Sequence, residues 1–297
     1  MTQITREQFD NFHIAVKTSF QGAFDNVTVN YTDIAEVIPS SGKGNAYDWL
    51  GEIPDIREWI GDRVLNEVGK HGYYIKNKKF EGTIRVNIDD IDDGDIGQYG
   101  VLSRGIGKKA ANFPQSLVFK TLKAGFNELC YDGQNFFDTD HPVTINDEDS
   151  VVSNMQAGAN EPWFLLDTTQ IIKPIIFQER LKPEFSSLDA DTNTQVFMKD
   201  EYAFGTKQRC NTGYGFWQMA FGSKAPLTET NLKAARKKMR QLKNNAGESL
   251  GIVPNVLVVG SSNEDIAEKL INAEKISGEY NTIKGKYALV VSAFLDD

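Results

Sequence analysis

The stretch YYIKNKKFEGTIRVNI, residues 73–88, indicates the fold class of this chain. Through its second half, apolar residues or glycine alternate with polar residues, which is the period of a β-strand with one buried face. The alternating positions are Phe80, Gly82, Ile84, Val86 and Ile88. Because KNKK at 76–79 is turn-like, the stretch predicts a long two-stranded hairpin with a basic tip. Such a hairpin is only marginally stable alone, so another surface must cover its apolar face.

The residues before this hairpin predict an arm and then a compact element. Residues 1–45 are polar, with two short apolar patches, and end in PSSGKGN at 39–45. This composition is typical of a flexible arm and not of a packed domain. From Trp49 onward, WLGEIPDIREWIGDR at 49–63 concentrates large apolar side chains, so a short packed element is expected to begin there.

The residues after the hairpin predict an acidic loop and a long helix. The run DDIDDGDIG occupies 89–97, and helical spacing of apolar residues then predicts one helix from about 98 to 130. Proline is tolerated in a first helical turn but not deep inside a straight helix. Because of Pro114, we therefore expect a kink or a restart near Asn112.

The second half of the chain predicts strands and then a small α/β module. The segments read as strands between 163 and 222 are WFLL, IIKPIIF, TQVFMK, EYAFGTK and GYGFWQMAFG. The last is apolar on both faces, which is typical of a central or interface strand. The module starts with a helix from Thr228 to about Asn244, whose inner stripe is Leu232, Ala235, Met239 and Leu242. A buried strand at 255–259 follows, and then a helix that is capped by Ser262 or Asn263 and reaches Asn272. A strand at 287–295 ends the module.

Composition and charge exclude several classes of protein. The chain has 297 residues, and its 18 Phe, 10 Tyr and 4 Trp exclude a disordered polypeptide. Its 41 acidic residues outnumber 32 basic ones, and the net charge of −9 disfavours specific nucleic-acid binding. Cys130 and Cys210 lack metal or redox spacing, so both are expected to be reduced inside a cell. Neither an export signal nor a membrane span is predicted.

The acidic run suggests a binding site for a divalent cation, but the spacing of its residues does not match that of a calcium-binding loop. With Gly94 at the glycine position of an EF-hand, Ile91 and Gly100 occupy two ligand positions. We interpret the run as a solvated loop that the following helix N-terminus favours, with a weak calcium or magnesium site as the alternative. GIGKKA at 105–110 formally matches a dinucleotide-binding fingerprint, but no buried strand precedes it, so it predicts no nucleotide site.

Two further motifs have both a chemical and a structural interpretation. FFDTDHP at 136–142 places Asp138, Asp140 and His141 together, as in a metal site or an acid–base pair. The adjacent turn residues favour a chain of turns instead, so we expect no catalytic residue, no metal and no cofactor. KAARKKMRQLK at 233–243 carries six positive charges and no negative one. It is interpreted as the solvated face of a helix, with an acidic patch of a neighbouring copy or nucleic acid as alternatives.

Six collinear blocks carry a resemblance to a known family. They are WLGEIPDIREWIGDR (49–63), YYIKNKKFEGTIRVNIDDIDDGDIGQYG (73–100), LVFKTLKAGFNELCYDGQNFFDTDHPV (117–143), KPIIFQERLKPEF (173–185), FGTKQRCNTGYGFWQMAFGS (204–223) and PNVLVVGSS (254–262). These blocks closely resemble the Mu-like phage major head subunit, the family called gpT. An arm and a hairpin without internal partners also fit a shell subunit, whose neighbours would cover them.

The resemblance implies an α+β fold, the tailed-phage major capsid fold of the Hong Kong 97 type. Residues 1–45 would be the N-arm and 46–92 the extended loop. Residues 93–227 would be the peripheral domain with its long spine helix and a sheet, and 228–297 the axial domain. The strands at 163–222 would either complete the peripheral sheet or contribute to both domains.

The function implied is that of a major capsid protein in the virion, assembled in the bacterial host cytoplasm from hexamers and pentamers. The icosahedral shell would enclose the double-stranded DNA of a Mu-like phage or prophage without binding it specifically. A separate scaffold is expected because no fused scaffolding segment is apparent, together with a maturation protease, a portal and decoration proteins. The alternatives are an encapsulin-like compartment and a metal-dependent hydrolase; no enzymatic activity is expected.

The resemblance assigns the hairpin at 73–88 to contacts between subunits. Its apolar face would be covered by a neighbour, and its basic tip would meet the acidic run of a neighbour and set the register of the contact. The residues predicted to make these contacts are Lys76, Lys78, Lys79, Phe80, Ile84, Val86, Ile88, Asp89, Asp90, Asp92, Asp93 and Asp95.

Overall fold

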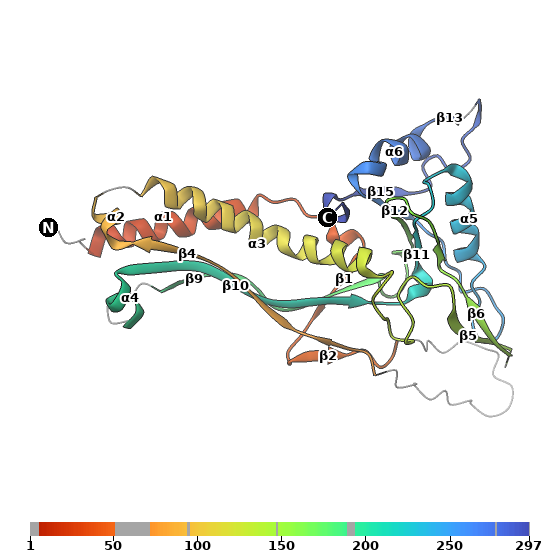
Figure 1. Ribbon diagram of the computed structural model, residues 1–297, viewed down its shortest axis with the longest axis horizontal. Helices are drawn as coiled ribbons and strands as arrows, with labels where there is room; N and C mark the ends of the chain where they lie inside the picture. The colour runs from red at the N-terminus through yellow and green to blue at the C-terminus, as the bar shows by residue number, and fades with distance from the viewer. Residues whose placement is uncertain are drawn as a thin grey trace.

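The computed structural model describes residues 6–50, 72–93, 96–146, 148–188, 194–276 and 278–296. In these residues the subunit is elongated (Figure 1), with long helices and strands toward the N-terminus and a more compact body at the other end. Helices and sheets are mixed, as an α+β class requires. Of the packed element predicted at 49–63, only Trp49 and Leu50 lie in the described residues, and Leu50 is fully buried.

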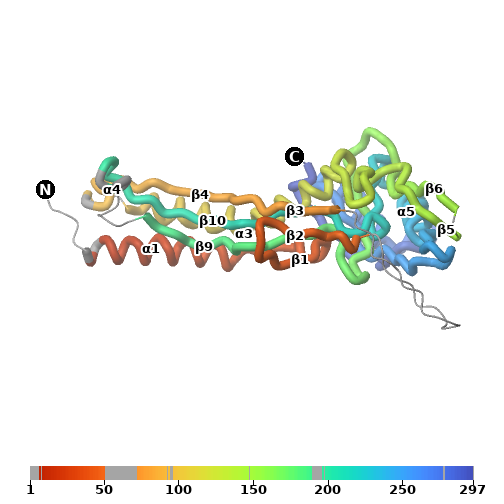
Figure 2. The backbone as a smooth tube through the Cα atoms, turned by 90° about the horizontal axis from the view of Figure 1, so that it is seen from below, coloured from red at the N-terminus to blue at the C-terminus, as the bar shows by residue number. Residues whose placement is uncertain are grey.

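The elongated part is a four-stranded sheet covered by two helices. Its strand order is β1 (Ala35–Pro39), β9 (Ile175–Leu188), β10 (Glu201–Tyr214) and β4 (Lys78–Asn87). β1 runs parallel to β9, whereas β10 is antiparallel to both β9 and β4. Helices α1 (Arg6–Asp25) and α3 (Gly97–Ala124) run along one side of these strands (Figure 2).

The predicted hairpin at 73–88 is wrong. β3 (Tyr74–Lys76) pairs with β2 (Gly44–Ala46), whereas β4 pairs with β10 along its whole length. Between them Asn77 is buried, and its side chain donates to Ser40 Oγ at 2.8 Å and accepts from Gln178 Nε2 at 2.7 Å. KNKK is therefore not a turn, because buried polar partners hold Asn77 between two strands that follow one another.

The N-terminal segment is not the unpacked arm that its polar composition suggested. α1 lies on α3 and buries one stripe, Phe12, Val16 and Phe20. The contact is close: Ser103 Oγ donates to the carbonyl of Val16 at 2.7 Å, and a Cβ on Gly107 would lie 2.3 Å from the carbonyl oxygen of Phe20. The glycines of GIGKKA therefore lie within α3, and Gly107 provides room for α1 instead of a nucleotide phosphate.

The predicted spine helix is confirmed, although it is shorter than expected. α3 ends at Ala124 instead of near 130, and the helix continues through Pro114 without a restart. After it the chain turns back through a bridge between Leu129 and Asn135. This reversal buries Phe136 and Phe137 against the core, which explains why apolar residues continue beyond the end of the helix.

The compact end is built on a five-stranded sheet. Its order is β15 (Ala288–Val291), β12 (Val256–Val259), β8 (Trp163–Leu166), β11 (Ala220–Ser223) and β7 (Met155–Gln156). β8 and β12 are buried at every position. Because this sheet combines strands from both sides of residue 228, it contradicts the predicted boundary between 93–227 and 228–297. The strands of 163–222 contribute to both sheets, which was one of the two alternatives.

Local predictions in the second half were partly correct. The segment at 194–199 forms α4 (Thr194–Lys199) instead of a strand, and GYGFWQMAFG is broken by a 3-10 turn at Trp217–Met219. α5 (Glu229–Arg240) starts after its cap Thr228, close to the predicted start, but it ends at Arg240 instead of near Asn244. α6 (Glu264–Asn272) follows Asn263 and reaches Asn272, as predicted. The remaining elements are α2 (Ile88–Asp92), β5 (His141–Ile145), β6 (Glu148–Val152), β13 (Lys275–Ile276), β14 (Glu279–Tyr280) and 3-10 turns at Tyr31–Asp33, Ser261–Asn263 and Ala293–Leu295.

Candidate functional site

The three lysines of the predicted tip lie along a sheet edge. β4 is an edge strand of its sheet, and Lys78 and Lys79 face Cys210 and Arg209 in the ladder with β10. Lys76 lies at the end of β3, opposite Gly44. All three lysine side chains are exposed. An exposed strand edge with lysines resists pairing with unrelated chains, and it leaves the cations available to a partner.

The apolar face of β4 is covered by its own subunit. Val86 is fully buried in a cluster with Phe12, Tyr99 and Phe204 from α1, α3 and β10. The ring of Phe80 lies 4.4 Å, centroid to centroid, from that of Phe113 on α3. The expectation that a neighbouring copy covers this face is therefore wrong for Val86, because α1 takes that position. Sequence reasoning missed this cover because it treated α1 as an arm.

The acidic run starts with a short helix and not with a cation-binding loop. The side chain of Asn87 caps α2 by accepting from the backbone N–H of Asp89 at 3.1 Å. Asp90 accepts a hydrogen bond from the hydroxyl of Tyr99, so it ties α2 to α3. Asp95 and the side chain of Asp92 lie outside the described residues. The solvated Asp89 and Asp93 side chains are exposed at the same end of the subunit as α1.

A short ladder that sequence reasoning missed connects the N-terminal segment to the sheet. β2 and β3 pair closely, since a Cβ on Gly44 would lie 2.3 Å from the carbonyl oxygen of Ile75. Beneath the ladder, Tyr47 Oη donates to Gln178 Oε1 at 3.0 Å, and Gln178 Nε2 also donates to the carbonyl of Ile75 at 3.1 Å. Gln178 is fully buried, so this network holds the ladder rigidly on β9. Gly44 was the available signal, but it lay in a tract interpreted as flexible.

His141 belongs to a buried polar cluster with partners other than those the motif suggested. Its Nδ1 lies 2.6 Å from Asp132 Oδ2, and its Nε2 lies 3.2 Å from Asn154 Oδ1. The imidazole ring stacks on Trp217 with 4.0 Å between ring centroids. Asp138 accepts from the backbone N–H of Thr139 at 2.7 Å, which confirms the turn interpretation for that residue. Asn154 lies 13 residues after His141, in the connection between β6 and β7, and no motif spacing links the two.

The chemistry of this cluster is structural. Cys130 Sγ, Asp132 and His141 offer ligand atoms within 4.8 Å of one another, which is a geometry that a metal ion could use. However, Cys130 Sγ already donates to Asp132 Oδ1 at 3.0 Å, and His141 is engaged on both ring nitrogens. Desolvation raises the pKa of Asp132, but hydrogen bonds from His141 and Cys130 outweigh it and lower the pKa overall. Cys130 and Cys210 are free, as predicted, and both are buried.

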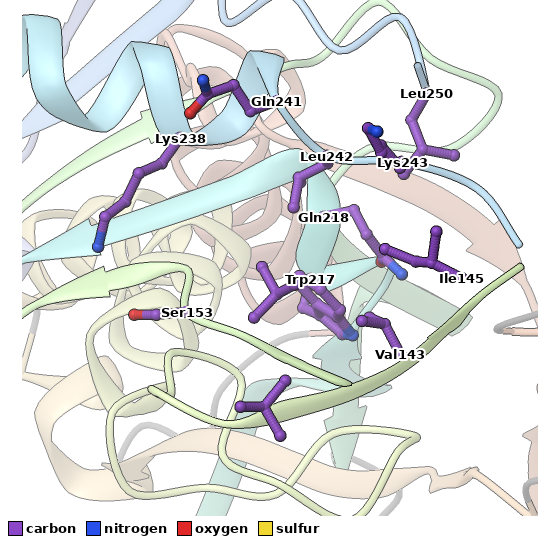
Figure 3. A pocket seen from close by; sticks show the side chains of 12 residues that line it. Val143, Ile145, Ser153, Trp217, Gln218, Lys238, Gln241, Leu242, Lys243 and Leu250 are labelled. Carbon is purple, nitrogen blue, oxygen red and sulfur yellow. The ribbon is translucent and has the colours of Figure 1, made fainter. Parts of the chain in front are cut away.

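A groove of about 320 Å³ lies between the β5–β6 hairpin and α5. Figure 3 shows Trp217 at its centre, Val143 and Ile145 from the hairpin on one side, and Leu242 and Leu250 on the other. Lys238 extends away from α5 at the edge of the groove. The walls are mostly apolar, and Val151 at the groove is 65% exposed. The groove therefore has the composition of a contact surface and not of a reaction centre.

Sequence comparisons agree on one family. The family model described as Mu-like prophage major head subunit gpT matches residues 9–295. The chain is 40% identical to the major capsid protein of Escherichia phage Mu over 292 residues, which cover 94% of this chain and 95% of the relative. It is 39% identical to the Mu-like prophage FluMu major head subunit of Haemophilus influenzae, and the match covers 92% of each.

Structure comparisons agree with the sequence comparisons. A chain of the procapsid of bacteriophage JBD30 has a TM-score of 0.83 and 40% identity, with 98% of this chain and 100% of that chain covered. A chain of the JBD30 capsid decorated with minor capsid protein trimers has a TM-score of 0.78 and 32% identity, with 93% and 94% covered. The fold is that of tailed-phage capsid subunits of the Hong Kong 97 type. No helix in the described ranges is long and apolar enough to cross a membrane.

Proposed function

Because the chain belongs to the family of Mu-like prophage major head subunits, we propose that it forms hexamers and pentamers that close into an isometric shell around double-stranded DNA. The protein is a major capsid subunit of a Mu-like head, as the sequence resemblance predicted. Family membership also favours this function over an encapsulin-like compartment and over a metal-dependent hydrolase.

The likeness to the JBD30 procapsid chain, with a TM-score of 0.83 over almost the whole chain, supports the proposal most strongly. Both the elongated part and the compact end are included in that match. Electron microscopy after expression with the neighbouring head genes tests it, and we expect hollow isometric particles. A product that stays monomeric or dimeric under those conditions would contradict the proposal.

We assign the parts of the subunit as follows. The sheet of β1, β9, β10 and β4 with α1 and α3 forms the peripheral domain, which therefore includes most of the residues first assigned to an arm. The β2–β3 ladder is the described part of the extended loop. The five-stranded sheet with α5 and α6 forms the axial domain, so the peripheral domain is interrupted by it in sequence.

The exposed sheet-edge lysines remain candidates for contacts between copies. Lys76, Lys78 and Lys79 are exposed. In a neighbouring copy, the exposed Asp89 and Asp93 are acidic partners for them, at the end of the subunit where α1 and α2 lie. Exposed ion pairs weaken as salt increases. Replacing the three lysines with glutamine should therefore make assembly less sensitive to salt. Lys182→Gln on β9, whose side chain is 79% exposed, provides the control and should leave the salt dependence unchanged.

The shell is proposed to enclose DNA without binding it specifically and to act without catalysis. A net charge of −9 repels phosphates, so the isolated subunit should bind duplex DNA no better than about 0.1 mM at physiological salt. A steep salt dependence with tight binding would contradict this. A separate scaffold, a maturation protease, a portal and decoration proteins are proposed as partners. The JBD30 capsid carries minor capsid protein trimers, which supports decoration.

A further inference from the structure

A second groove, of about 350 Å³, lies on α5 and is strongly basic. It runs between α5 and the residues 282–286 that precede β15. Lys233, Arg236, Lys237, Arg240 and Lys286 line it. Five cations around one groove in a chain of net charge −9 mark it as a site for an anionic partner.

Two of these cations are held by their own subunit, and three are not. Lys233 forms an ion pair with Glu229 at 2.5 Å, and Arg236 donates to the carbonyl of Pro254 at 3.2 Å. Within the described part of the chain, no ion pair reaches Lys237, Arg240 or Lys286, and all three side chains are exposed. Three unpaired cations are thus available to a partner.

An acidic corner lies beside α5 at the tip of the β5–β6 hairpin. It consists of Glu148 and Asp149 on β6 and Glu248 in the turn after α5, and all three are exposed. The backbone N–H of Asn146 donates to the carbonyl of Asn245 at 2.7 Å and joins the hairpin to that turn. Asp149 accepts a hydrogen bond from Thr144 at 3.0 Å, so this carboxylate has a defined position.

The basic groove and the acidic corner lie on opposite flanks of α5. At about 100° per residue, Lys233, Lys237 and Arg240 lie on one side of the buried stripe. Lys238, which lines the apolar groove beside the β5–β6 hairpin, lies on the other side. Both flanks belong to the same end of the elongated subunit (Figure 1). In a ring with these ends at its centre, one flank of each copy faces the opposite flank of the next copy.

We propose that the acidic corner of one copy docks into the basic groove of the next copy around a capsomer. The inference rests on the proposed assembly into rings and identifies the partner as a second copy of this chain. Opposite charges on two different surfaces favour a head-to-tail contact and disfavour the pairing of like surfaces. The contact would therefore set the direction in which the ring closes.

A charge exchange tests the proposal in the full-length protein expressed with its head genes. The groove variant Lys237→Glu with Arg240→Glu should lose its shells, because acids would then face acids. Adding Glu148→Lys and Asp149→Lys in the same chain should restore shells to near the wild-type yield, because each contact is complementary again. Circular dichroism and thermal unfolding of each soluble subunit check that the variants fold.

The control is Lys182→Glu with Lys207→Glu, two exposed lysines on β9 and β10, which changes the net charge equally but away from both flanks of α5 and should still assemble. If the groove variant and the wild type both form normal shells, the inference is overturned and the proposed function is left intact. A groove variant that folds but is not rescued by the exchange would also overturn it, and would point to DNA or a scaffold as the partner. Absence of shells from the wild type would instead contradict the proposed function.

Discussion

The contact between α1 and α3 can be tested by adding one methyl group. In Gly107→Ala the new Cβ would lie 2.3 Å from the carbonyl oxygen of Phe20, a separation that real Cβ atoms do not adopt. Gly105 lies one half-turn away in the same helix, and a Cβ there would have nothing within 4 Å. The two variants therefore make the same chemical change in two different environments.

The expected difference in unfolding free energy follows from comparing the two variants. Alanine in place of glycine inside a helix stabilises by about 0.5–1 kcal/mol, and this gain applies to both. Overpacking costs about 1–3 kcal/mol, and only Gly107→Ala incurs it. Phe12, Val16 and Phe20 are each at most 4% exposed, and burying them contributes on the order of 4.5–9 kcal/mol. Because this exceeds the overpacking cost, α1 should shift on α3 and not detach.

The assay is denaturant unfolding of the purified subunit, with limited proteolysis of α1 as a second readout. We expect Gly105→Ala to raise the free energy of unfolding by about 0.5–1 kcal/mol. Gly107→Ala should lie about 1–3 kcal/mol below Gly105→Ala and should be cleaved faster within α1. Equal unfolding free energies for the two variants would refute the inference that Gly107 is required for helix packing.

Three further predictions concern the core. The lowered pKa of Asp132 contributes stability that is present above its unfolded value of about 3.9 and is lost as pH falls through the folded pKa. The unfolding free energy of Asp132→Asn should therefore change less than that of the wild type as the pH is lowered below about 4. The same pH dependence for both proteins would contradict this. Burial raises the pKa of Cys210 to about 12 and also raises that of Cys130, so thiol reagents should label neither residue in the folded subunit and both after denaturation; rapid native labelling would count against it. Val86→Asp should destabilise the isolated subunit by several kcal/mol because it buries an unpaired charge, whereas a folded subunit that only fails to assemble would show that a neighbour covers this face.

The elements that sequence predicted well are those whose determinants are local. α5 has its cap at Thr228 and a buried stripe at Leu232, Ala235 and Met239, so spacing along the chain suffices to define it. The same holds for the buried strand β12 and for most of α3. The family was also recognisable, because long aromatic blocks preserve residue identity along the whole chain.

The largest errors concern which segment lies against which. A strand at 80–88 was predicted and β4 forms at 78–87, but its partner is β10, more than 100 residues later, and not the adjacent segment. Likewise, the buried residues of α1 were too few to suggest a packed helix until α3 supplied Ser103 and Gly107 opposite them.

The residues of the proposed contact surfaces also divide into features that the sequence shows and features that only the structure shows. Sequence showed six positive charges at 233–243 and three lysines at 76–79, because charge is a property of each residue. It could not place Lys286 beside Lys237, or join Asn146 of the hairpin to Asn245 of the turn after α5, since those neighbours come from separate elements. The sequence by itself therefore determined the family, the local helices and the charges. Only the tertiary structure decided which surfaces face outward together, because long-range pairing depends on packing energies that no local pattern encodes.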